Sequence, residues 1–233
     1  LIVTPPSVEF KIVRNNNEEI IIRNPSKIDE YTNIKKIEER ICELDLLFPK
    51  QYLGSIMKLL NDKRGVQLDL VYLSTSMVKA KYTIPLLELV SGFYDSLKSI
   101  SQGFASLDYK ILDFEVGNLV KLDILVNGLS IDSFSSILSK ENSEFIGRSR
   151  VKKLSKLIPR QQFDIPIQAA IGSRIIARET IKALRKDVTA KLYGGDVTRK
   201  RKLLEKQKEG KKKMRNIGKV EVPKEAFKEF LKE

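Results

Sequence analysis

The sequence has no histidine and no tryptophan, and Cys42 is its single cysteine. Without histidine, the chain has no imidazole for general acid–base catalysis, for a Ser-His or Cys-His nucleophile pair, or for most zinc sites. A single cysteine excludes an internal disulfide bond, which agrees with a reducing compartment. Cys42 lies in an alternating apolar segment, where a small core side chain is a better interpretation than a nucleophile.

Long apolar runs and glycine-rich phosphate-binding loops are also missing. No apolar run approaches the roughly 18 residues of a membrane-spanning helix, and no segment has the pattern of a secretory signal peptide or of a P-loop. We therefore expect no active site and no cofactor in this chain. It begins at Leu1 on a strand-like segment, so we expect it to be part of a longer protein.

Positive charge is concentrated in one third of the chain. The formal net charge is +13, yet residues 148–219 hold 23 of the 43 basic side chains and only 6 of the 30 acidic ones. The remaining residues are slightly acidic. Such a distribution indicates a polyanion-binding module attached to an ordinary globular body, and the hydrophobic fraction of 42% is sufficient for real cores.

The polyanion is either a nucleic acid or an anionic membrane. A helix that lies in a membrane interface needs a broad apolar face with Trp, Phe or Leu. The basic segment offers only Leu203 and Leu204 as a wedge. RNA is therefore the favoured partner, and loose peripheral attachment to an anionic membrane is the weaker alternative.

The first 113 residues divide into a connector and an α+β domain. Residues 1–35 have a hairpin pattern, with alternation over 8–13, a turn at 15–18 and a return over 19–23, and we assign them to the end of a preceding domain. Residues 36–113 give the order βαββαβ of a ferredoxin-like domain. Its second helix is expected to follow Pro85 continuously, and the free face of its sheet is open to a neighbour or to RNA.

The remaining residues divide at about residue 195. Residues 114–195 form a basic α+β domain, in which we expect a strand over 120–126, a short helix over 131–138 and a basic helix over 148–157. The segments 161–171 and 174–184 fit either strand or helix, and the small residues 169–172 predict a close crossing. Residues 196–233 begin with a long basic helix over 196–217 and end with a short helix over 223–231.

Several strings in the sequence are more specific than its composition. They closely resemble, in order, the C-terminal half of the translation factor LepA (elongation factor 4). These strings are Pro49-Lys-Gln-Tyr-Leu-Gly, Asp62-Lys-Arg-Gly-Val-Gln, Gly103-Phe-Ala-Ser-Leu-Asp-Tyr, Leu157-Ile-Pro-Arg-Gln-Gln-Phe, Gln168-Ala-Ala-Ile-Gly-Ser, Ile175-Ile-Ala-Arg-Glu-Thr, Lys182-Ala-Leu-Arg-Lys-Asp-Val, Lys191-Leu-Tyr-Gly-Gly-Asp and the basic run that starts at Arg199.

The resemblance implies a function for the chain. Residues 36–113 would be the ferredoxin-like domain shared with elongation factor G, followed by the domain peculiar to LepA. The family is a ribosome-dependent GTPase proposed to act on tRNA position, by back-translocation or in the fidelity of elongation. Its GTP-binding domain, with GTP and Mg²⁺, would lie upstream of Leu1, so no residue here is assigned a catalytic or metal-binding role.

The same resemblance implies partners and a location. The expected partners are the ribosome, through large-subunit rRNA, and tRNA, with the chain as a monomer. The expected location is the bacterial cytoplasm, bound to ribosomes, with a mitochondrion or plastid as the alternative. Two rival functions are a freestanding structural or ribosomal RNA-binding protein without GTPase activity, and an RNA-modifying enzyme, for which the sequence offers no catalytic groups.

The RNA-binding candidates lie mainly in the basic helix. Ten basic and two acidic residues between Arg199 and Arg215 favour RNA over a merely solvated face, and we expect this helix to be mobile until a partner orders it. For Lys152, Lys153, Arg160 and the Tyr193 turn, RNA contact and a structural role weigh equally. The candidates are Arg160, Lys191, Tyr193, Gly194, Gly195, Arg199, Lys200, Arg201, Lys202, Lys206, Lys208, Lys211, Lys212, Lys213 and Arg215.

Overall fold

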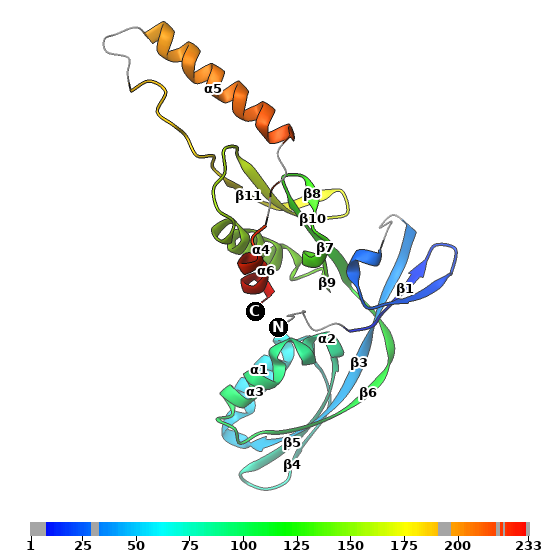
Figure 1. Ribbon diagram of the computed structural model, residues 1–233. Helices are drawn as coiled ribbons and strands as arrows, with labels where there is room; N and C mark the ends of the chain where they lie inside the picture. The colour runs from blue at the N-terminus through cyan, green and yellow to red at the C-terminus, as the bar shows by residue number, and fades with distance from the viewer. Residues whose placement is uncertain (1–7, 29–32, 191–196, 218–219, 221, 232–233) are drawn as a thin grey trace. The chain divides into compact units, whose positions relative to one another are not determined.

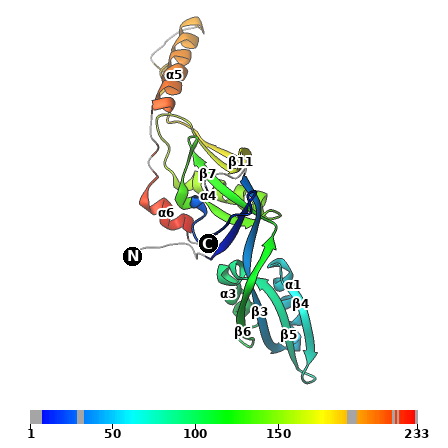
Figure 2. The ribbon, with the colours of Figure 1, turned by 90° about the vertical axis from the view of Figure 1, so that its right-hand side faces the viewer.

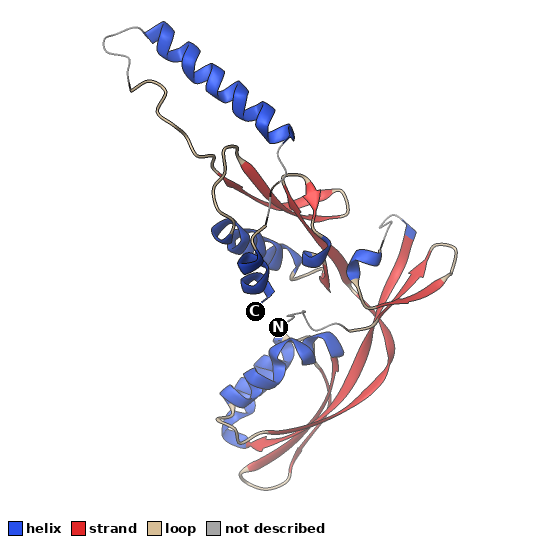
Figure 3. Cartoon of the chain, in the orientation of Figure 1, coloured by secondary structure: helices blue, strands red, loops and turns tan. Residues whose placement is uncertain are grey.

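The computed structural model describes residues 8–28, 33–190, 197–217, 220 and 222–231. The chain forms two compact units, which divide between Asn118 and Leu119. Both units contain antiparallel strands and helices (Figure 3). The fold class is therefore α+β, as the sequence predicts.

The first unit starts with the predicted hairpin. Strands β1 (Phe10–Arg14) and β2 (Glu19–Ile22) pair antiparallel. Strand β1 also pairs with the first part of β3 (Ile34–Pro49), so the hairpin belongs to the same sheet as the strands that follow. A short 3₁₀ turn, η1 (Pro25–Lys27), is capped by the side chain of Asn24.

The rest of the first unit has the predicted βαββαβ order (Figures 1 and 2). Its four strands lie in the order β6-β3-β5-β4, all antiparallel, which is the ferredoxin-like arrangement. The elements after β3 are η3 (Lys50–Tyr52), α1 (Leu53–Asp62), β4 (Val66–Tyr72), β5 (Met77–Pro85), α2 (Leu86–Glu88), η4 (Leu89–Phe93), α3 (Tyr94–Ile100) and β6 (Ser106–Gly117).

Alternation along β3 and β5 builds the core of this unit. Leu44 and Leu46 of β3 are fully buried, and they pack with Ile56 and Leu60 of α1. Cys42 is buried beside them, and burial raises the pKa of its thiol. Cys42 is therefore a core side chain, as its position in the alternation indicates.

The predicted continuous helix after Pro85 is broken. Ser91 and Gly92 leave helical geometry, and Gly92 has a φ of +75°. Leu89 and Phe93 remain buried, but Val90 and Tyr94, which we placed on the apolar stripe, are 42% and 60% exposed. The break rotates the two halves relative to one another, so one continuous stripe cannot describe both.

The sheet face away from the helices carries opposite charges. Lys79 Nζ lies 3.3 Å from Asp45 Oδ1, and Lys81 Nζ lies 3.1 Å from Glu43 Oε1. The register places Lys81 opposite Asp45, while the buried Leu46 and Ala80 alternate with them toward the helices. These paired charges disfavour RNA as the occupant of this face, because phosphate binding needs unmatched cations.

The second unit is a sheet covered by helices on one side (Figures 1 and 3). Its strand order is β11-β10-β7-β8, and β9 also pairs with β7. Helix α4 packs on the sheet and α6 packs beside α4. The elements are β7 (Leu119–Val126), β8 (Leu129–Ser130), η5 (Asp132–Phe134), β9 (Ser136–Ser139), α4 (Ser143–Leu157), β10 (Ile165–Ile171), β11 (Arg174–Ile181), α5 (Val197–Ile217) and α6 (Lys224–Leu231).

The structure corrects one helix of this unit and settles two ambiguous segments. The short helix expected over 131–138 is wrong, because a 3₁₀ turn occupies 132–134 and residues 136–139 pair with β7 as a strand. The segments 161–171 and 174–184 contain strands β10 and β11. In each case pairing with a neighbouring strand, a tertiary effect, decides the local structure.

Small residues allow α4 to approach the sheet closely. A Cβ atom on Gly147 would lie 3.2 Å from Ala169 Cβ and 2.9 Å from Ile176 Cδ1. The close crossing expected at residues 169–172 is therefore found at Ala169. In the same core, Phe227 and Phe230 of α6 pack on Phe134, with ring centroids 4.7 and 4.2 Å from that of Phe134.

Candidate nucleic-acid interface

Helix α5 comprises 21 residues, Val197–Ile217, which corresponds to about 31 Å at 1.5 Å per residue. One side of it is partly covered by the extended segment that follows β11 (Figure 1). Gln207 Nε2 donates a hydrogen bond to the carbonyl of Lys186 at 2.8 Å, and Lys211 Nζ donates to the carbonyl of Leu184. The extended segment and α5 therefore run side by side.

Most described cations of α5 have no acidic partner. Arg201 pairs with Glu205 at 3.1 Å within the helix, and Arg199 also has an interaction partner. The lysines on the side of α5 away from the extended segment form no ion pair among the described residues. They are exposed and comprise Lys202, Lys206, Lys208, Lys212 and Lys213.

The charges of α5 are arranged in rows. At about 100° of rotation per residue, Glu205 and Glu209 lie on the side of the helix opposite the covered Gln207. Cations flank this acidic row on both sides: Arg201, Lys208 and Lys212 on one, and Lys202, Lys206 and Lys213 on the other. A helix with two basic rows can contact the phosphate backbones of two strands rather than one.

The segments before and after α5 are both attached to the core of the second unit. Before α5, Ala183 N donates to Asp164 Oδ1 and Leu184 N donates to the carbonyl of Gln161, each at 2.7 Å. After α5, Val220 and Val222 pack against the core, and α6 follows. Helix α5 is therefore anchored at both sides and is not a free terminal arm.

Six predicted site residues in and near α5 remain. Lys191, Tyr193, Gly194 and Gly195 lie outside the described residues. Lys200 lies on the partly covered side of α5 and Arg215 in its last turns. Contact of these six residues with RNA stays a prediction.

Arg160 lies in the loop before β10 and has a structural contact. Its guanidinium donates to the carbonyl of Lys182 at 2.9 Å and to that of Ala183 at 3.0 Å. In α4, Lys153 Nζ similarly reaches the carbonyl of Phe230 at 3.5 Å. Both residues thus hold backbone in place, whereas Lys152 is exposed and has no ion-pair partner among the described residues.

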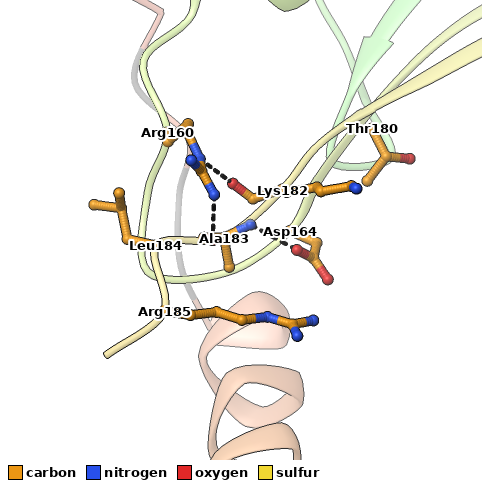
Figure 4. A pocket seen from close by; sticks show the side chains of 7 residues that line it. All are labelled: Arg160, Asp164, Thr180, Lys182, Ala183, Leu184 and Arg185. Carbon is orange, nitrogen blue, oxygen red and sulfur yellow. Dashed lines mark hydrogen bonds between the residues drawn. The ribbon is translucent and has the colours of Figure 1, made fainter. Parts of the chain in front are cut away.

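A hollow of about 570 Å³ lies where the chain leaves the core toward α5 (Figure 4). It is lined by three cationic side chains and one carboxylate. Two of these cations, Lys182 and Arg185, are absent from the predicted site. The lining residues are Arg160, Asp164, Thr180, Lys182, Ala183, Leu184 and Arg185.

Asp187 and Glu179 are the acidic residues nearest in sequence to Arg185 and Arg178. Neither pair forms a salt bridge among the described residues. Asp187 Oδ1 instead accepts hydrogen bonds from Thr189 N at 2.9 Å and Thr189 Oγ1 at 2.8 Å, and these lower the pKa of Asp187. Residues 182–186 contain three basic and no acidic side chains. This local excess of positive charge is the sequence feature that could have indicated that Arg185 has no ion-pair partner in the described part of the chain.

Within the part of the chain that the structure describes, no group of three or more Cys, Asp or Glu side chains is placed to hold a metal ion. No helix among those residues is both long enough and apolar enough to cross a membrane.

Comparison with known proteins assigns both units. Residues 36–125 match the family model "Elongation factor G C-terminus", and residues 126–232 match "GTP-binding protein LepA C-terminus". The whole chain aligns with proteins named elongation factor 4, at 51% identity over 232 residues in Clostridium tetani and at 53% in Leptospira biflexa. The chain belongs to the LepA family.

The LepA relatives are longer than this chain. It spans 38% of the Clostridium tetani protein and 39% of the proteins from Leptospira biflexa and Sulfurimonas denitrificans, the last at 50% identity. The LepA-specific model covers α4, the hollow and α5, whereas the ferredoxin-like strands fall in the part shared with elongation factor G. By family, these residues are the C-terminal region of a translation factor.

Proposed function

We propose that this LepA-type region binds the ribosome and tRNA, and that α5 supplies the principal contact with RNA phosphates. The observation that carries the proposal is the set of exposed lysines on α5 that have no acidic partner among the described residues. Each phosphate that a lysine neutralises releases counterions, so such a surface binds a phosphodiester backbone strongly at low salt. Docking of the whole region must supply specificity, because backbone contacts carry little sequence information.

The two basic rows favour a folded RNA as the partner. Lysines on both sides of the Glu205–Glu209 row suit a helix that lies between two phosphate strands, as in tRNA or large-subunit rRNA. A membrane is less suited to this surface, because Leu204 and Met214 are isolated apolar residues among lysines and give no continuous apolar face.

The wider role follows from the family. We propose that the region positions a GTPase on the ribosome, that GTP and Mg²⁺ bind in a part of the protein upstream of Leu1, and that the complex acts on tRNA position by back-translocation or in elongation fidelity. The corresponding location is the bacterial cytoplasm, on ribosomes. A freestanding RNA-binding protein is less well supported, because the elongation factor 4 relatives extend well beyond the aligned residues.

The test removes four exposed charges from α5. In Lys202→Gln/Lys206→Gln/Lys212→Gln/Lys213→Gln, we expect binding to tRNA and ribosomes to weaken roughly 10²–10³-fold at 0.1 M salt, and the slope of log affinity against log salt to fall by about 3. Filter binding with labelled tRNA and ribosome co-sedimentation over a salt series measure both quantities.

The matched control removes the same charge from the first unit. Lys27, Lys58, Lys98 and Lys110 are exposed and form no ion pair among the described residues, so their replacement by Gln should leave the slope unchanged. If the α5 variant and this control behave alike, α5 is not the RNA-binding surface.

A further inference from the structure

The hollow beside the segment that leads from β11 to α5 has the chemistry of a phosphate site. Arg160, Lys182 and Arg185 line it with a single carboxylate, that of Asp164, so its formal charge is positive. We propose that this hollow binds one phosphate group of the RNA strand whose neighbouring phosphates lie on α5. The inference rests on the proposed RNA-binding function and extends it to a second, separate contact.

The backbone around the hollow is held in place before any ligand binds. The Arg160 guanidinium spans the carbonyls of Lys182 and Ala183 at 2.9 and 3.0 Å, and the amides of Ala183 and Leu184 are bonded to residues 164 and 161. The segment that carries Lys182 and Arg185 is thus fixed to the loop before β10. A fixed backbone lowers the ordering cost of binding an anion there.

The two cations on this segment are available to a ligand. Neither Lys182 nor Arg185 forms an ion pair among the described residues, and both are exposed. In Figure 4 the side chains of Lys182 and Arg185 extend toward the same side, and the Asp164 carboxylate is drawn between them. A guanidinium and an ammonium on one side of a hollow provide a bidentate and a point-charge contact to a phosphate.

The carboxylate of Asp164 would repel an anion in the hollow, but it already accepts a hydrogen bond from the backbone. One of the carboxylate oxygens accepts a hydrogen bond from the Ala183 amide at 2.7 Å, which stabilises the carboxylate but leaves its negative charge in place. That charge reduces anion affinity, so neutralising Asp164 while keeping an acceptor for Ala183 should strengthen phosphate binding. Asp164→Asn makes that change.

The hollow and α5 are adjacent, which is why one strand is expected to reach both. Lys211 of α5 donates to the carbonyl of Leu184, the residue before Arg185, and Gln207 bonds to the carbonyl of Lys186, the residue after it. The phosphate in the hollow would therefore have cations of α5 as its immediate neighbours.

The experiment compares the intact chain with Lys182→Gln/Arg185→Gln in tRNA binding over a salt series. The control is Lys140→Gln/Lys156→Gln, which removes two exposed cations of the same unit that have no ion-pair partner among the described residues. We expect the hollow variant to lower the salt slope by about 1 more than the control and to weaken binding about tenfold at 0.1 M salt. Asp164→Asn should bind several-fold more tightly than the intact chain.

A second arm separates RNA phosphate from free phosphate. Inorganic phosphate is titrated while the Nε–Hε NMR signals of the arginines are followed. If phosphate shifts the Arg185 signal but the hollow variant matches its control in tRNA binding, the hollow takes a small anion and the inference is overturned. If the α5 quadruple variant loses its salt slope and the hollow variant does not, the inference fails while the proposed function stands.

Discussion

Arg64 shows how one residue can join three elements of the first unit. It follows α1, and its guanidinium contacts both carboxylate oxygens of Glu39 in β3, at 2.6 and 3.0 Å. Its Nε also donates to Glu88 of α2 at 3.2 Å. The Glu39 side chain is only 3% exposed, so this carboxylate depends on Arg64 for compensation of its charge.

Replacing this arginine should therefore be costly. We expect Arg64→Met to lower the free energy of unfolding of the first unit by about 3–5 kcal/mol, because Glu39 would remain buried without its partner. Urea unfolding followed by NMR signals of the first unit measures the change. Lys58→Met, on the exposed surface of α1, is the control, and Arg64→Met/Glu39→Gln should recover part of the loss. Equal stability of Arg64→Met and the control would show that Glu39 does not need this ion pair.

At the scale of elements, α4 and α5 differ in what holds them. Helix α4 buries Val151 and Leu154 in the core of the second unit. None of the described side chains of α5 is buried, and Gln207 and Lys211 hydrogen-bond to the extended segment at residues 184–186. A helix that buries little apolar surface is marginal in water. We therefore expect the order of α5 to depend on a ligand.

Hydrogen exchange tests this difference. In the free chain we expect the amides of α5 to exchange at least tenfold faster than those of α4, and to slow on addition of tRNA at low salt, because bound phosphates order the helix. Mass spectrometry with peptides from both helices provides an internal control. Equal protection of α4 and α5 without RNA would contradict the expectation.

The elements also show what a sequence can predict. Alternation over β3 and β5 predicts both strands and the core side chains Leu44 and Leu46, because one sheet face is buried and the period is strict. The break at Gly92 was missed because a single glycine does not by itself mark the end of a helix. The strand over 136–139 was missed because pairing with β7 decides it. Lys182 and Arg185 were not predicted to line a hollow, because only the fold brings Arg160 beside them.

At the scale of the whole molecule, the chain consists of two units with separate cores. The two family models meet between residues 125 and 126, and the compact units divide between 118 and 119. The domain limits expected from the sequence, after residues 35, 113 and 195, remain a prediction. Separate cores imply that a change in one unit need not unfold the other.

A pair of phenylalanines in the second unit tests that independence. We expect Phe230→Ala to destabilise the second unit by about 3–5 kcal/mol, because Phe230 is 6% exposed and packs on Phe134. Phe145→Ala, at a side chain that is 79% exposed, should cost little. Urea titrations that follow NMR signals of each unit measure both, and a shift of the first unit's transition by Phe230→Ala would show that the two cores unfold together.

The two-sided anchoring of α5 has a consequence for how this region can change. A segment whose entry and exit are both fixed to one core behaves as a loop insertion, and each doubling of such a loop adds only about 0.6 kcal/mol of closure entropy. Its reach toward RNA can therefore be lengthened or shortened by insertion and deletion at little expense to the rest of the unit. The residues of α5 that contact RNA and the core residues that keep the unit folded can therefore change independently.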